Sequence, residues 1–167
     1  GIQLYDSSNN TIEKNTVSNN GYGIYLWYSS NNIIYLNNFI DNTDQVQSYD
    51  STNIWNSTEP ITYTYNGNTY TNYLGNYWDD YAGEDANGDG IGDTPYAIDG
   101  DNDYYPLMEP WENYVQPVAA FTYEPENPMI DEDIEFNASL SFSPNGIVEY
   151  RWEFGDGNST IEADPVT

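Results

Sequence analysis

Gly1-Ile2-Gln3-Leu4-Tyr5 and Gly23-Ile24-Tyr25-Leu26-Trp27 are two versions of one pattern, placed 22 residues apart. The register continues beyond them, so that Asn15 corresponds to Asn37. Aliphatic residues alternate with polar or aromatic ones, which is the period of a strand with one buried face. Ser/Asn pairs follow each run, as expected at tight turns. The repeat predicts stacked coils of a β-solenoid over residues 1–44, with Asn15 and Asn37 in an internal ladder.

The composition favours an all-β chain. Aromatic residues make up 17% of it and tyrosine alone supplies 18 residues, while no stretch shows a helical apolar period. The 28 acidic residues face only Lys14 and Arg151, for a net charge of −26. Two cations cannot form a groove for nucleic acid or a patch for anionic lipid, so both partners are excluded. No apolar run approaches the ~20 residues that cross a bilayer, so no membrane insertion is expected.

The repeat also resembles a known group. Its motif Gly-Ile-Tyr-Leu, followed by Ser-Ser-Asn-Asn at 29–32, is similar to the right-handed parallel β-helix repeats of NosD-like proteins. The segments 76–81, 89–96 and 99–108 are similar to the tail of such domains in archaeal surface proteins. The resemblance implies the end of a right-handed parallel β-helix and an extracellular, cell-surface location. Copper, which the group name suggests, lacks suitable ligands, because the chain has no His or Cys and only Met108 and Met129.

Residues 45–112 are expected to cap the coils. Ile61–Tyr65 and Asn68–Thr71 alternate on either side of Asn66-Gly67, which predicts a hairpin with a type I′ turn. Such a hairpin could cover the open end of the coils. Aromatic residues in this region are expected to supply apolar bulk or, alternatively, to form sugar-stacking platforms: Trp55, Tyr73, Tyr77 and Trp78.

The acidic stretch within this cap has the pattern of a calcium loop. Oxygen donors recur at alternate positions before a glycine, and the expected ligands are Asp85, Asn87, Asp89, the Ile91 carbonyl and Asp93. Tyr96 occupies the position where a bidentate carboxylate is needed, so Asp99, Asp101 or Asp103 would supply it. Calcium is therefore the predicted cofactor. The alternative is a solvated turn rich in Gly and Asp.

The pattern of residues 113–167 predicts a second β-domain. Short alternating strands are expected at 118–123, 134–137 and 147–154, as in an antiparallel sandwich. The segment 150–157, Tyr-Arg-Trp-Glu-Phe-Gly-Asp-Gly, resembles the signature of PKD domains, which are Ig-like sandwiches. The resemblance implies that Trp152 and Phe154 face a core. The stretch is expected to hold only the N-terminal part of that sandwich.

Four Asn-x-Ser/Thr sequons predict N-glycosylation and agree with secretion: Asn9, Asn56, Asn137 and Asn158. Catalysis is not expected, because lyase chemistry needs a cationic base and only Lys14 and Arg151 are present. We therefore expect a non-catalytic, calcium-stabilised structural module of an archaeal cell-surface, sheath or filament protein. Its partners would be further copies or surface-layer and sheath components. The alternatives are a glycan-binding or adhesion module and the remnant of a polysaccharide-degrading β-helix enzyme.

Overall fold

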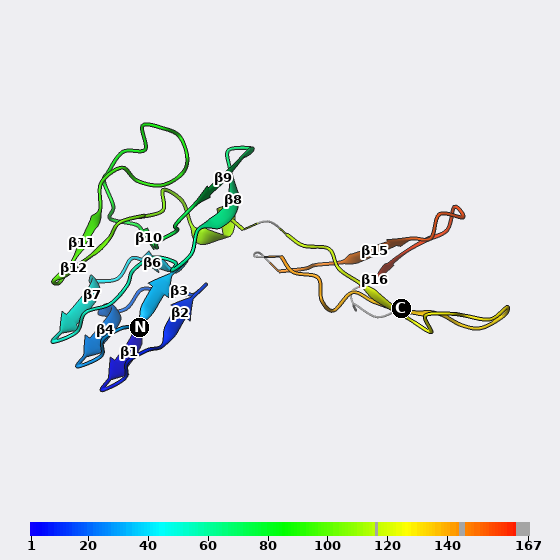
Figure 1. The fold of residues 1–167 in the computed structure, drawn as a ribbon, viewed down its shortest axis with the longest axis horizontal. Helices are drawn as coiled ribbons and strands as arrows, with labels where there is room; N and C mark the ends of the chain where they lie inside the picture. The colour runs from blue at the N-terminus through cyan, green and yellow to red at the C-terminus, as the bar shows by residue number, and fades with distance from the viewer. Residues whose placement is uncertain (116, 144–145, 163–167) are drawn as a thin grey trace. The chain divides into compact units, whose positions relative to one another are not determined.

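The computed structural model describes residues 1–115, 117–143 and 146–162, and the chain forms two compact units, Gly1–Tyr114 and Val115–Thr167 (Figure 1). In the described part the one helical element is a 3-10 helix, η1 (Trp111–Asn113). The all-β class predicted from composition is confirmed. No helix of the described residues is long and apolar enough to cross a membrane.

Parallel sheets form the base of the first unit (Figure 1). One contains β1 (Ile2–Tyr5), β4 (Tyr22–Trp27) and β7 (Asp44–Tyr49). Another pairs β2 (Thr11–Glu13) with β5 (Ile33–Tyr35). A further one contains β3 (Thr16–Ser18), β6 (Asn38–Ile40) and β10 (Tyr77–Trp78).

The strand register confirms the 22-residue repeat. Ile2 lies opposite Ile24, and the same offset relates the partners in the other two sheets. The parallel pairing also continues past residue 44, where the repeat was expected to fade, because Ile24 lies opposite Val46 in β7. Ser48 stands opposite Leu26, so the inward aliphatic pattern is lost although the backbone pairing persists.

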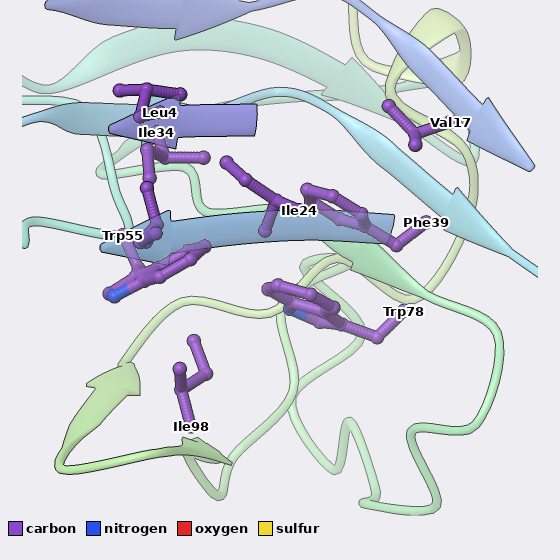
Figure 2. Packing of buried hydrophobic residues seen from close by; sticks show 9 residues of the cluster. Leu4, Val17, Ile24, Ile34, Phe39, Trp55, Trp78 and Ile98 are labelled. Atoms are coloured by element: carbon purple, nitrogen blue, oxygen red, sulfur yellow. The ribbon is translucent and has the colours of Figure 1, made fainter. Parts of the chain in front are cut away.

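The hydrophobic core lies between these sheets (Figure 2). The inward strand residues Leu4, Ile24, Leu26, Ile34 and Phe39 pack together with the indoles of Trp55 and Trp78. The ring of Phe39 stacks on Trp78 with centroids 4.5 Å apart, and Trp78 stacks on Tyr96 at 4.4 Å. Both indoles are 1% exposed, so they supply apolar bulk, as expected, and cannot serve as sugar platforms.

Asparagine ladders run along the turns between strands. Asn15 Nδ2 donates to Asn37 Oδ1 at 3.0 Å, which confirms the predicted pair, and Asn37 Nδ2 donates to Asn76 Oδ1 at 3.0 Å. A parallel ladder joins Asn32 to Asn53, where the Nδ2–Oδ1 distance is 2.9 Å. Each oxygen also accepts the backbone N–H of the preceding asparagine in the ladder, so the ladders satisfy donors that a turn leaves unpaired.

The predicted hairpin forms from β8 (Ile61–Tyr65) and β9 (Asn68–Asn72). Both turn residues have positive φ, 48° at Asn66 and 79° at Gly67, as a type I′ turn requires. However, among the described residues this hairpin contributes nothing to the hydrophobic cluster of the parallel sheets. That cluster is covered by β10 and by Ile98 of β11 (Tyr96–Ile98), which pairs with β12 (Asp101–Asp103) (Figure 2).

The second unit contains two antiparallel pairs. They are β13 (Thr122–Glu124) with β14 (Glu135–Asn137), and β15 (Tyr150–Glu153) with β16 (Ser159–Glu162). Trp152 is buried, as expected, whereas Phe154 is 44% exposed, with its ring centroid 5.4 Å from that of Phe136. Residues 163–167 of the expected sandwich lie outside the described part of the chain.

Candidate functional site

The acidic stretch separates into two groups of residues with different partners. Asp85, Asn87, Asp89 and Asp93 lie in the loop between β10 and β11. Asp99 precedes β12, and Asp101 and Asp103 lie on it. The sequence-predicted ligands thus lie in two segments of the chain, the loop and the β12 region.

The loop carboxylates are hydrogen bonded to the backbone of their own loop. Asp85 Oδ1 accepts the N–H groups of Gly88 at 2.8 Å and Asp89 at 3.2 Å, and its Oδ2 accepts that of Gly90 at 2.8 Å. Asp93 Oδ2 accepts another loop N–H at 2.8 Å. These bonds explain the loop's shape, because a carboxylate that accepts several backbone N–H groups fixes a tight turn.

The prediction of calcium as a cofactor is wrong. Among the described residues, no group of three or more His, Cys, Asp or Glu side chains is placed to hold a metal ion. The alternating Asp/Asn pattern resembles a metal loop because both structures need oxygen acceptors around a tight turn. In this loop the carboxylate oxygens accept hydrogen bonds from backbone N–H groups. Ile91, the expected carbonyl ligand, is buried and bridges to Leu107.

Asp101 terminates one asparagine ladder. Its Oδ2 accepts the backbone N–H of Asn53 at 2.8 Å and the indole N–H of Trp55 at 3.2 Å. In the preceding coil the same backbone position, at Asn32, donates to the Asn53 side chain at 2.9 Å. Asp101 thus accepts the backbone N–H that the next asparagine of the ladder would accept, while the buried Nδ2 of Asn53 has no hydrogen-bond partner among the described residues.

Asp103 terminates the other ladder. Its Oδ2 accepts the backbone N–H of Asn76 at 2.7 Å and the indole N–H of Trp78 at 3.0 Å, while Oδ1 accepts the N–H of Tyr105 at 3.0 Å. The carboxylate is completely buried, and burial raises its pKa to about 6, although these hydrogen bonds oppose the rise.

Two further aspartates accept hydrogen bonds from backbone N–H groups of residues 41 and 48. Asp79 Oδ2 accepts the N–H of Asp41 at 2.6 Å, and Asp99 Oδ2 accepts that of Ser48 at 3.3 Å. We call Asp79, Asp99, Asp101 and Asp103 the terminal carboxylates. An asparagine accepts and donates, so it passes a ladder onward, whereas a carboxylate only accepts and ends it. The terminal carboxylates thus accept backbone N–H groups along one edge of the parallel sheets.

A second feature lies on the outward face of β1, β4 and β7. Tyr5, Trp27 and Tyr49 are partners in register, and their rings stack with centroid distances of 6.4 Å and 4.4 Å. Tyr25 lies beside Trp27 at 6.3 Å, and Tyr28 stands at 82° to it. We call these five residues the aromatic face. The sequence contained its signal, because Tyr5, Trp27 and Tyr49 are spaced by 22 residues.

The four sequons differ in accessibility. Asn9 and Asn158 are exposed, whereas Asn56 and Asn137 are partly buried. The Asn56 side chain donates to Ser57 O, and Asn137 Oδ1 accepts the N–H of Ser139. Asn158 Nδ2 also donates to Asp156 Oδ2 at 2.8 Å, so Asn9 offers the more accessible acceptor. Glycosylation stays a prediction at all four sequons.

Comparison with known proteins agrees with the division of the chain into two units. Residues 1–83 match the family described as periplasmic copper-binding protein (NosD), and residues 114–167 match the PKD domain. The chain thus contains a NosD-like region followed by a PKD domain.

The probable ABC transporter binding protein NosD of Stutzerimonas stutzeri is 37% identical over 95 residues. The match covers 56% of this chain and 19% of that protein, so the chain spans about a fifth of the length of its relative. No solved structure matches the chain.

The copper in the family description does not fit the donors of this chain. Copper sites in proteins are built mainly from imidazole, thiolate and thioether groups. The sequence has no His and no Cys, and its two methionines, Met108 and Met129, belong to different units. We therefore assign no copper chemistry to these residues.

Proposed function

We propose that this chain is a non-catalytic structural module of an extracellular or periplasmic surface protein. In this proposal residues 1–114 are the closing end of a right-handed parallel β-helix, and the PKD domain follows it. The location is supported by the periplasmic description of the matching family. The proposal extends to the archaeal cell-surface, sheath or filament setting that the sequence resemblance implied.

The closure by the terminal carboxylates is the observation that carries the proposal. An exposed end of stacked parallel strands presents unpaired N–H groups that template further strands. Here Asp101 and Asp103 occupy the backbone donors of Asn53 and Asn76, and Trp78 and Ile98 cover the apolar layer. Self-association and contacts with surface-layer or sheath components therefore belong to other faces of the chain.

The proposal is tested by opening this end. The double variant Asp101→Ala/Asp103→Ala of the full chain is expected to form oligomers or aggregates, because the freed donors can pair with a second copy. Light scattering coupled to size exclusion measures the mass. Asp44→Ala, which removes an exposed carboxylate from β7, is the matched control and should leave the mass unchanged.

A double variant that stays folded, with unchanged mass at high concentration, would show that the carboxylates are not needed to prevent assembly. Circular dichroism of the same samples separates this outcome from simple unfolding. Hydrolysis or cleavage of a polysaccharide by the purified chain would contradict the non-catalytic part of the proposal.

A further inference from the structure

The pair Asn-Gly occurs in the sequence at residues 20–21, 66–67, 87–88 and 145–146, and the fold holds these pairs differently. In such a pair the glycine nitrogen can attack the side-chain carbonyl carbon of the asparagine, because glycine has no Cβ to hinder the approach. Asn145 lies outside the described residues. The other three pairs differ in the hydrogen bonds that hold the asparagine carboxamide and the glycine nitrogen.

The first pair lies in the turn between β3 and β4, where the Asn20 carboxamide is part of a ladder. Its Nδ2 donates to Ser18 O at 2.8 Å and to Asn42 Oδ1 at 3.1 Å. The backbone N–H of Asn20 also donates to Asn42 Oδ1, at 3.0 Å. The carboxamide therefore cannot turn towards the nitrogen of Gly21 unless these bonds break.

The pair Asn87-Gly88 is exposed, but both of its reacting groups are hydrogen bonded. Asn87 Oδ1 accepts the N–H of Asp89 at 3.0 Å, and Asn87 Nδ2 donates to Asp89 Oδ2 at 3.1 Å. The Gly88 nitrogen, which would be the nucleophile, donates its N–H to Asp85 Oδ1 at 2.8 Å. Attack at this pair therefore requires the acidic loop to open.

The pair Asn66-Gly67 forms the exposed tip of the β8-β9 hairpin and is held least. Among the described residues no backbone carbonyl accepts the Gly67 N–H, and a Cβ at Gly67 would meet nothing within 4 Å. The Asn66 side chain hydrogen bonds to the hydroxyl of its neighbour Tyr65. Only the terminal pair of Tyr65 with Asn68 must separate for the tip to open, and loop tips open at low free-energy cost.

We propose that Asn66 is a site of spontaneous deamidation in the folded chain, and that the fold protects Asn20 and Asn87. When the tip opens, the Gly67 nitrogen forms a bond to Asn66 Cγ and gives up its proton. The carboxamide nitrogen takes up a proton and leaves as ammonia, which closes a succinimide ring. Water then opens the ring at either carbonyl and gives aspartate or isoaspartate, so the step needs no oxidant or reductant.

Isoaspartate at residue 66 is expected to loosen the hairpin and, through it, the acidic loop. A type I′ turn needs two adjacent residues of positive φ, and isoaspartate inserts an extra carbon into the backbone between them. The hairpin holds the loop through two hydroxyl groups. Tyr63 donates to Asp89 O at 2.9 Å, and Tyr70 donates to Gly88 O at 3.1 Å. Both strands that carry these tyrosines are joined by the turn at residue 66.

Peptide mapping by mass spectrometry tests the proposal, after the full chain has been incubated in mildly alkaline buffer. Asn66 is expected to deamidate at least about tenfold faster than Asn20 or Asn87. The same chain unfolded in urea is the control, because the three Asn-Gly pairs then lack their hydrogen bonds and should react at similar rates. Equal rates at the three sites of the folded chain would overturn the proposal, as would the same ranking in urea.

The variant Asp85→Ala tests the protection of Asn87 separately, since it frees the Gly88 nitrogen. Deamidation at Asn87 should become about tenfold faster, while the rate at Asn66 stays the same. Asp44→Ala, which removes an exposed carboxylate from β7, is the matched control and should change neither rate. Circular dichroism establishes that both variants are folded. An unchanged Asn87 rate in the folded Asp85→Ala chain would contradict the assigned cause of protection.

Discussion

Replacement of Asp103 with asparagine removes a buried charge and keeps the side chain's size. Burial raises the Asp103 pKa from 3.8 to about 6, so the folded state binds a proton more tightly than the unfolded state. A difference of about 2 pH units corresponds to about 3 kcal/mol. The stability of the unaltered chain should therefore decrease by this amount as the pH rises from about 4 to above 6. Asparagine does not titrate, so the variant lacks this decrease.

A lost hydrogen bond makes a second contribution to the change in the free energy of unfolding of Asp103→Asn. The amide oxygen of Asp103→Asn can still accept from Asn76 and Trp78, but its NH2 group faces the N–H of Tyr105. The lost bond costs about 1–3 kcal/mol. At about pH 4 the variant should therefore be less stable by that amount. At about pH 7.5 the relief of the buried charge offsets the loss, and the two proteins become similarly stable or the variant more so.

Urea unfolding followed by tryptophan fluorescence measures this difference, because Trp55 and Trp78 are buried in the core. Curves recorded from about pH 4 to about pH 7.5 should show the variant gaining about 3 kcal/mol relative to the unaltered chain. Taking the difference cancels the titration of carboxylates that both proteins share. Asp44→Asn, at an exposed site in β7, is the control. The reasoning would be refuted if the difference in unfolding free energy between the variant and the unaltered chain stayed constant across this pH range.

Four other substitutions test the packing and turn geometry of the first unit. Gly75→Ala should destabilise the chain by about 3 kcal/mol, since a Cβ there would lie 1.9 Å from Asp103 Oδ1. Gly67→Ala should cost only about 1 kcal/mol, because φ is 79° but nothing lies within 4 Å, and equal unfolding midpoints for the two glycine variants would contradict this account. Asn37→Ala should cost about 3 kcal/mol by leaving ladder donors unpaired, measured by urea unfolding. Trp78→Ala should lower stability by about 3–5 kcal/mol in the same assay, and a smaller loss would argue against its place in the core.

Local patterns in the sequence predicted much of the first unit. The 22-residue offset correctly placed Ile2 beside Ile24, and the Asn-Gly pair correctly placed the hairpin turn. Both features depend on alternation and turn chemistry within a short stretch. The third strand of this parallel sheet, β7, was not predicted from the repeat. Ser48 stands where an inward aliphatic residue was expected, although the backbone pairing is kept.

The role of the terminal carboxylates could not be read from the sequence. Asp101 and Asp103 bind backbone N–H groups 48 and 27 residues away, so no local spacing links them to Asn53 and Asn76. Their neighbours instead suggested a metal loop, because closely spaced oxygen acceptors suit a cation and a set of backbone donors equally well. Only the position of the ladders distinguishes the two uses.

Amide hydrogen exchange at Asn53 and Asn76 tests the closure of the coils most directly. The account predicts strong protection of both N–H groups in the unaltered chain, since each donates to a terminal carboxylate at 2.8 Å or less. Asp101→Ala should release Asn53 selectively, and Asp103→Ala should release Asn76 selectively. Exchange of both amides in the unaltered chain at the rate of exposed loop residues would contradict the account.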